Sequence, residues 1–190
     1  EFPVEGETGE SKPANLDKIK ERGVLKVGYR PSNVPFSYYN NTGDLVGFDI
    51  AMAEELAKDI GVSIEFVPFR KDQIAIGLNK GYFDIVMSGL GVDVDNLQTM
   101  NFSIPVLKLN RALVTQDHRV KELSDLDTIM ALDQLKVAYV EHDRLINDVR
   151  PTMPHVTFVS IENYKQFFQQ EPGSYDALLI SAEAGSAWTL

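Results

Sequence analysis

Apolar residues recur at four-residue intervals within residues 47–60, which is the spacing of one face of an α-helix. The positions concerned are Phe48, Met52, Leu56 and Ile60. Residues 24–29 and 62–67, on either side, have the composition of strands, and Gly61 is a typical helix end. The chain therefore begins with a β–loop–α–β unit. In such a unit the loop after the first strand lies at the mouth of a cleft where ligands bind.

Strand and helix patterns continue to alternate along the rest of the chain. A short helix is predicted before the first strand, at 16–22. The later predictions are a helix at 72–80, strands at 83–87, 111–115 and 136–140, a helix at 144–149, a strand at 156–160, a helix at 162–170 and a strand at 175–180. This alternation predicts an α/β fold whose strands are mostly parallel.

The polarity of the chain divides it into four parts. Residues 1–13 are polar and acidic, and we expect a disordered leader there. Residues 14–115 are predicted to form a first lobe and residues 136–190 a second one, with the polar stretch 116–135 as the crossover or hinge segment between them.

Composition narrows the classes of partner. The 190 residues carry a net charge of −10, which argues against nucleic acid and against anionic membrane surfaces. Apolar runs stay shorter than the roughly 18 residues of a membrane span. The chain has no cysteine, so disulfides, thiolate nucleophiles and cysteine zinc sites are excluded. We expect neither a cofactor nor a metal.

Five segments, taken in register, resemble a known family. They are Leu16-Asp-Lys-Ile-Lys-Glu-Arg-Gly-Val-Leu-Lys-Val-Gly, Pro35-Phe-Ser-Tyr, Gly43-Asp-Leu-Val-Gly-Phe-Asp-Ile-Ala-Met-Ala, Gly81-Tyr-Phe-Asp-Ile-Val-Met-Ser-Gly and Asn101-Phe-Ser-Ile-Pro. The chain is similar to the bacterial extracellular solute-binding proteins of family 3, the periplasmic amino-acid-binding type. The resemblance implies a type II periplasmic-binding-protein-like fold, in which two α/β lobes close by a hinge on a small solute. It also implies a location in the periplasm or on the extracellular face of a bacterial membrane, and delivery of the solute to a membrane permease or transporter.

The same resemblance implies that the chain should return to the first lobe after the second. We find no such return before residue 190, so the fold is expected to be short at its C-terminal end. An unpaired edge would then remain in the first sheet, and homodimerisation through that edge is an expectation.

Three recognition elements of the amino-acid binders are altered in this chain. Asp93 and Asn96 occupy the positions of a Thr-x-x-Arg motif whose Arg clamps the ligand carboxylate. The acidic segment 141–143 replaces a Gly-Thr turn, and Ser181 replaces the Asp that binds the ligand ammonium group. The ligand therefore stays open between an amino acid and another carboxylate-like solute.

Two arginines are candidates to replace the lost clamp. Arg30 follows the first strand, in a stretch similar to the branch of the family that binds acidic amino acids. Arg70 follows the second strand at the same expected edge. A guanidinium binds a carboxylate through two parallel hydrogen bonds. The alternative is that both arginines are solvated surface residues.

Four other residues complete the candidate site. Phe36 is expected either to wall the pocket or to fill the lobe core. Ser88 and Gly89 follow a strand, where a hydroxyl and backbone groups meet ligands in this class of fold. His142 is either a ligand or pH-sensing residue or an exposed loop histidine.

We expect a binding protein rather than an enzyme, because the common hydrolase, metalloprotease, phosphate-loop and dinucleotide motifs are missing from the sequence. One alternative is a ligand-sensing or accessory domain excised from a larger membrane receptor or transporter. A further alternative is a relative of the dehydratases or lytic transglycosylases that share this fold, with Asp93, Glu141 and Asp143 as acid–base groups.

Overall fold

The computed structural model describes residues 16–70, 73–92, 97, 99–140, 145–169, 171 and 173–189. The chain divides into two compact units, here called unit 1, which ends at Val106, and unit 2, which begins at Leu107. Each unit is an α/β layer structure of its own, as the alternating pattern predicts.

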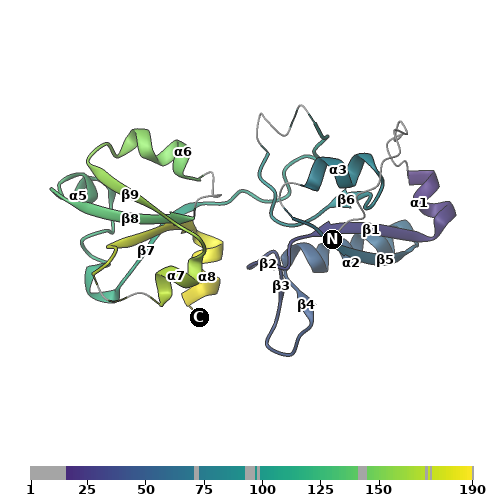
Figure 1. Cartoon of the computed structure of the whole chain (residues 1–190), viewed down its shortest axis with the longest axis horizontal. Coiled ribbons are helices and arrows are strands. Elements are labelled where there is room, and N and C mark those ends of the chain that lie inside the picture. The colour runs from purple at the N-terminus through teal and green to yellow at the C-terminus, as the bar shows by residue number, and fades with distance from the viewer. Residues whose placement is uncertain are drawn as a thin grey trace. The chain divides into compact units, whose positions relative to one another are not determined.

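Unit 1 is built on a three-stranded parallel sheet with β1 at its centre. The strands are β1 (Val24–Tyr29), β5 (Ser63–Pro68) and β6 (Ile85–Val86). The helices α1 (Leu16–Arg22) and α2 (Phe48–Ile60) pack on one face of the sheet, and α3 (Ile74–Asn79) packs on the other (Figure 1). The sheet is thus covered on both faces, which is why its strands are rich in Val, Ile and Leu.

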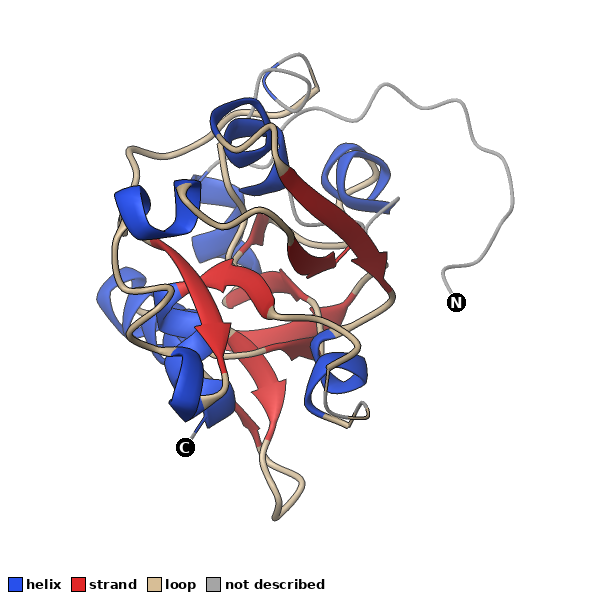
Figure 2. Ribbon diagram, turned by 90° about the vertical axis from the view of Figure 1, so that its left-hand side faces the viewer, coloured by secondary structure: helices blue, strands red, loops and turns tan. Residues whose placement is uncertain are grey.

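Three short antiparallel strands lie between β1 and α2, where the sequence pattern shows only a loop. They are β2 (Ser32–Asn33), β3 (Ser37–Tyr39) and β4 (Leu45–Val46), paired in the order β2-β3-β4. The β3–β4 hairpin projects from unit 1 and lies lowest in both views (Figures 1 and 2). Strands of two or three residues are too short to produce a readable alternation, so the sequence did not reveal them.

The buried face of α2 differs from the one predicted. Phe48 is 43% exposed, whereas Asp49, Ile50, Ala53 and Ala57 are buried. The small side chains of Ala53 and Ala57 let the helix approach the sheet closely, and the larger apolar residues flank this contact. The helix bounds are close to the prediction, and Gly61 ends α2 in the left-handed conformation, with φ of 81°.

Unit 2 contains a four-stranded sheet with the order β7-β10-β8-β9. Its strands are β7 (Arg111–Thr115), β8 (Leu135–Val140), β9 (Val156–Ile161) and β10 (Ala177–Ser181). Helices α5 (Leu126–Met130) and α6 (Leu145–Val149) cover one face, and α7 (Tyr164–Phe168) and α8 (Ala182–Thr189) cover the other (Figure 1). Two 3-10 turns, Asp117–Arg119 and Arg150–Thr152, complete the unit.

The pairing of strand β7 differs from the lobe boundary predicted from the sequence. The prediction placed residues 111–115 in the first lobe, but β7 pairs antiparallel with β10, so that Arg111 lies opposite Ser181. The division between the units therefore falls after Val106 rather than after residue 115. The predicted crossover 116–135 belongs to unit 2 and contains α5, whose Asp125 caps the helix by accepting a hydrogen bond from the amide of Thr128.

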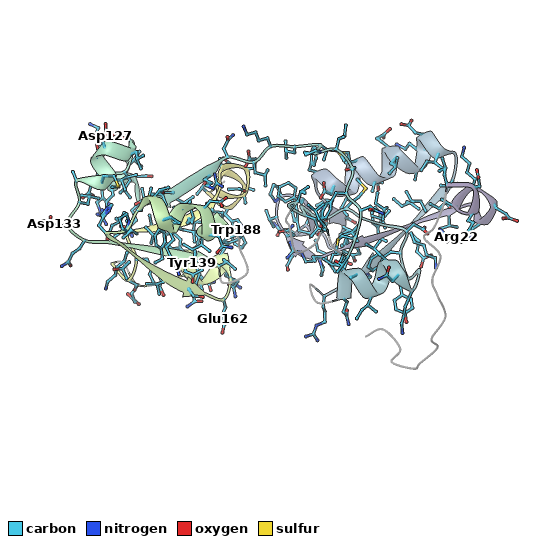
Figure 3. All side chains as sticks on the ribbon, turned by 90° about the horizontal axis from the view of Figure 1, so that it is seen from above. Arg22, Asp127, Asp133, Tyr139, Glu162 and Trp188 are labelled. Atoms are coloured by element: carbon cyan, nitrogen blue, oxygen red, sulfur yellow. The ribbon has the colours of Figure 1, made fainter. Side chains whose placement is uncertain are left out.

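The same pair of hydrogen bonds, between an aspartate that precedes one strand and a lysine of the neighbouring parallel strand, occurs in both sheets. In unit 1 the carboxylate of Asp84 accepts the Lys26 amide at 2.8 Å, and the Asp84 amide donates to the Lys26 carbonyl at 2.8 Å. In unit 2 Asp176 makes the same pair of bonds with Lys136, at 2.7 and 2.8 Å. An arginine also contacts each carboxylate: Arg22, labelled in Figure 3, and Arg119. Each aspartate thereby fixes the strand that follows it beside the first parallel strand of its unit.

Replacing Asp84 with alanine is expected to lower the free energy of unfolding by about 1 to 3 kcal/mol, because the part-buried Lys26 amide loses its acceptor. The matched control is Glu65→Ala, which removes a solvent-exposed partner 3.7 Å from the Lys26 ammonium group. The control should change stability by no more than about 0.5 kcal/mol. Urea denaturation measures both variants, and equal values for the two would show that the Asp84 bridge carries no stability.

Candidate functional site

The carboxyl ends of β1 and β6 meet at one edge of the unit 1 sheet. Arg30 follows β1 directly, and Ser88 and Gly89 follow β6 after one residue. Because β1 and β6 are paired and parallel, the residues after them lie side by side. This edge is where parallel α/β sheets bind their ligands.

A buried serine pair joins these two strand ends. Ser37 is 0% exposed and Ser88 is 1% exposed. The Ser37 hydroxyl donates to the Arg30 carbonyl at 2.8 Å, so its proton is used. In the 2.8 Å contact between the two hydroxyls, Ser88 is therefore the donor. Ser88 Oγ also accepts the Arg30 amide at 3.0 Å. The structure thus uses the Ser88 hydroxyl inside unit 1, where it holds the end of β1.

The loop at Ser88 and Gly89 is fixed from a second side by β2 and the turn that follows it. Asn33 Nδ2 donates to the Ser88 carbonyl at 2.7 Å, and the Phe36 amide donates to the Asn33 carbonyl at 2.7 Å. Phe36 is 6% exposed and lies against Gly89. A Cβ at Gly89 would lie 2.6 Å from the Phe36 ring and 2.8 Å from Asn33 Nδ2, and φ of 59° also favours glycine. Phe36 is therefore an interior residue of unit 1 that shapes this loop.

Asp49 holds the same loop from the third side and was not expected to do so. It is the second residue of α2 and only 6% exposed, and its carboxylate accepts the Gly89 amide. Burial raises the pKa of Asp49, and the bond from Gly89 acts in the opposite direction. Asp49 is not among the candidate site residues predicted from the sequence. The available signal was its spacing of four and eight residues from Ala53 and Ala57 on the buried face.

A tyrosine pair connects the end of β1 to the hairpin. The hydroxyls of Tyr29 and Tyr39 are 2.8 Å apart. Burial, followed by the hydrogen bond to Tyr39, raises the pKa of Tyr29 to about 12. Tyr29 therefore stays neutral at physiological pH and keeps its hydrogen-bonding proton.

The two candidate arginines follow neighbouring strands. Tyr29 and Pro68 are register partners at the ends of β1 and β5, and the Phe69 amide donates to the Tyr29 carbonyl at 3.0 Å. Arg30 is half-buried, whereas Arg70 is exposed, with its amide 3.3 Å from the side-chain oxygen of Gln73. The structure thus places both arginines after strands that end at the same edge of the sheet as the Ser88–Gly89 loop. A guanidinium group carries the donors that a carboxylate needs.

Of the remaining predicted residues, the structure describes Ser181 alone. Asp93, Asn96 and His142 lie outside the described residues, as do Glu141 and Asp143. Ser181 is described: it ends β10 in unit 2, is 5% exposed, and accepts the Ala184 amide on Oγ at 3.2 Å. Ser181 therefore caps α8, so its hydroxyl has a structural partner.

Unit 2 has a depression of about 690 Å³ along α7. Its lining is polar and comprises Glu162, Asn163, Lys165, Gln166, Gln169, Ser174 and Tyr175. None of these is a predicted site residue. Figure 3 labels Glu162, which belongs to this lining, and Trp188, which packs edge-on against Tyr164 of α7.

The described residues contain neither a metal-binding cluster nor a membrane-spanning helix. No group of three or more His, Cys, Asp or Glu side chains in the described ranges could hold a metal ion. Within the same ranges, no helix combines the length and apolar character needed to cross a membrane.

Two α/β units, each with a mostly parallel sheet, are typical of two-lobed binding proteins, and solved structures of the type II class resemble this chain. The ancestral amino acid-binding protein AncCDT-1, a precursor of cyclohexadienyl dehydratase, matches with a TM-score of 0.76 at 30% identity, over 92% of this chain and 77% of that one. A second structure of AncCDT-1, described as an ancestral cationic amino acid solute-binding protein, matches with a TM-score of 0.80 at 29% identity, over 91% of this chain and 76% of that one. The chain belongs to the bacterial extracellular solute-binding proteins, family 3, whose family pattern matches residues 25–171.

Curated relatives include both binding proteins and enzymes. Cyclohexadienyl dehydratase of Pseudomonas aeruginosa is 31% identical over 121 residues, which are 62% of this chain and 45% of the relative. The L-cystine-binding protein TcyJ of Escherichia coli is 33% identical over 90 residues, 47% of this chain and 34% of the relative. Membrane-bound lytic murein transglycosylase F of Vibrio cholerae is 38% identical over 86 residues, 45% and 16%. The chain thus spans less than half the length of these relatives.

Proposed function

We propose that the chain captures a small polar solute that bears a carboxylate, either an amino acid or a carboxylate-like compound, and delivers it to a membrane permease or transporter. The observation that carries the proposal is that Arg30 follows β1 beside the Ser88–Gly89 loop, and that Arg70 follows the neighbouring strand β5 at the same carboxyl edge of the unit 1 sheet. Membership of a solute-binding family supports the same role. The family also supports action in the periplasm or at the extracellular face of a bacterial membrane.

An anionic solute requires local cations, because the charge of the whole chain does not attract it. The chain as a whole carries a net charge of −10, so a non-specific attraction for anions is absent. Binding of a carboxylate must then come from a local pair of cations. Arg30 is the stronger candidate, because it is half-buried and hydrogen bonds to it compete less with water than those to the exposed Arg70.

A panel of amino acids, dicarboxylates and polyamines in a thermal-shift assay tests the proposal. A solute present at 100 times its Kd should add about 2.7 kcal/mol to the stability of the protein. We expect stabilisation by a carboxylate-bearing solute and none by the polyamines, which lack a carboxylate. Stabilisation by polyamines alone would overturn the assignment of the arginines.

Replacing Arg30 with alanine is expected to weaken the binding of the best solute about 10- to 100-fold, which corresponds to losing a charged hydrogen-bonding group worth about 1.5 to 3 kcal/mol. Arg70→Ala, at the exposed position, is the matched comparison and should cost less. Titration calorimetry measures both. An unchanged Kd in Arg30→Ala would remove this residue from the site.

A second candidate function has one observation in its favour. In the lytic transglycosylase relative, the matching segment makes up only 16% of the protein, so the same fold occurs there as part of a larger membrane-bound protein. A ligand-sensing or accessory domain of a larger membrane protein would use the same site. Binding alone cannot separate the two roles, whereas reconstituted uptake by a permease that depends on this chain would support solute delivery.

Some relatives are enzymes, whereas we propose that this chain binds its solute without converting it. This difference can be tested. A bound solute, including a cyclohexadienyl compound of the kind the dehydratase is named for, should be recovered unchanged after prolonged incubation. Consumption in proportion to the protein concentration would contradict this assignment.

Homodimerisation through the unit 1 sheet is the last part of the proposal. Among the described strands, β6 pairs on one side only, with β1, so its outer edge is available. Light scattering that gives the mass of a single chain at all concentrations would contradict a dimer.

A further inference from the structure

The buried carboxylate of Asp49 in unit 1 is not part of the proposed contact with solute. Asp49 lies on the face of α2 that carries Ala53 and Ala57, which pack on the sheet. Burying a carboxylate away from water is unfavourable unless it gains specific hydrogen bonds. The described partner of this carboxylate is the amide of Gly89.

The bond between Asp49 and Gly89 completes a three-sided support for one loop. Ser37 and the Arg30 amide hold the Ser88 hydroxyl, and Asn33 holds the Ser88 carbonyl. The Phe36 ring leaves no room for a side chain at Gly89. Of these supports, only Asp49 is ionisable, and a hydrogen bond to an ionised acceptor is about twice as strong as a neutral one.

We propose that Asp49 is a positioning residue for the solute site, whose carboxylate fixes the Gly89 amide and thereby the loop beside Arg30. This inference rests on the proposed function for its effect on affinity. The hydrogen bond from Gly89 is independent of that function. Asp49 acts through Gly89 and does not itself contact the solute.

Three variants separate positioning from simple stability. Asp49→Asn keeps an acceptor oxygen, whereas Asp49→Leu keeps a branched side chain with the same number of heavy atoms and has no acceptor. Asp59→Asn changes an exposed acid of the same helix and is the matched control. Each variant is characterised by the Kd for the best solute, by Tm, and by hydrogen exchange of the Gly89 amide measured by NMR.

We expect Asp49→Leu to weaken binding at least 10-fold and to speed exchange of the Gly89 amide at least 10-fold. Asp49→Asn should recover most of both properties, and the control should match the original protein. Tm should not fall in proportion to affinity, because leucine removes a buried charge as well as a hydrogen bond. An Asp49→Leu variant with the original Kd and a protected Gly89 amide would overturn the proposal. Losses of affinity in Asp49→Leu and Asp49→Asn that are proportional to their losses in Tm would also overturn it.

Failure of this inference is distinguishable from failure of the proposed function. If the original protein binds no solute of the panel, the proposed function fails, yet exchange of the Gly89 amide still reports whether Asp49 holds the loop. Exchange that is equally slow in the original protein and in Asp49→Leu would then refute the positioning role by itself.

Discussion

Phe83→Ala should lower the free energy of unfolding by about 3 to 5 kcal/mol, the largest effect expected for a single substitution in unit 1. Phe83 is 0% exposed, and its ring lies 5.6 Å from that of Phe69. Two glycines lie against the same ring: a Cβ at Gly28 would approach it to 3.0 Å, and one at Gly77 would overlap it. Since neither glycine has a side chain that could fill the vacated space, the substitution leaves a cavity.

A double-mutant cycle makes this prediction specific to the packing of Phe83. Gly77→Ala alone should destabilise the protein, because its methyl group overlaps the Phe83 ring. In the Phe83→Ala background the same change should cost far less, so the two effects should not add. Phe48→Ala, at a position that is 43% exposed, is the control and should cost about 1 kcal/mol or less. Simple additivity in urea denaturation would contradict the contact.

Gly47→Ala is expected to cost about 3 kcal/mol or more and also to weaken solute binding. Gly47 has φ of 133° and ψ of 172°, a region that is essentially restricted to glycine, and a Cβ there would overlap the Phe36 carbonyl. That carbonyl accepts the Asp49 amide at 3.0 Å, and the Pro35 carbonyl accepts the Phe48 amide at 3.0 Å. A side chain at this point therefore separates the start of α2 from the segment that carries Phe36.

Gly61→Ala is the matched control for this substitution. Gly61 also has a positive φ, of 81°, but a Cβ there would have no neighbour within 4 Å. Its cost should be limited to the backbone, about 1 to 2 kcal/mol, and solute binding should not change. Equal losses of stability and affinity in the two variants would show that the contact with Phe36 has no special role.

The sequence was sufficient for the main elements of both units, because their periodicity is long enough to read. The helix at 47–60 and the strands at 24–29, 136–140 and 156–160 agree with α2, β1, β8 and β9 within one or two residues. Five segments in register were sufficient for the family, which the match over residues 25–171 confirms. These features depend on local patterns, and local patterns are what a sequence displays.

The features that depend on tertiary contacts could not be predicted. The partner of β7 is β10, more than 60 residues further along the chain, and nothing in the strand itself specifies this pairing. The buried face of α2 contains Asp49, so a rule that seeks apolar residues selects Phe48 instead.

The side-chain contacts of the candidate site also depend on tertiary structure and could be predicted only in part. Arg30, Ser88 and Gly89 could be located from their positions after strands, and the structure places them together. Which polar groups face inward could not be read, because the partner of the Ser88 hydroxyl, Ser37, belongs to a hairpin that the pattern did not reveal. The Asp49 carboxylate is a second example, since only the position of Gly89 in space explains it.

The proposed function requires a solute that binds at the carboxyl edge of the unit 1 sheet. The most direct measurement is a titration of the ¹⁵N-labelled protein with the best solute of the panel, followed residue by residue through the NMR shifts of the backbone amides. The largest changes are predicted at Arg30, at Phe36 and in the loop at Ser88 and Gly89, and they should saturate with the Kd found by calorimetry. Changes confined to unit 2, for example along the depression between Glu162 and Tyr175, would contradict the account.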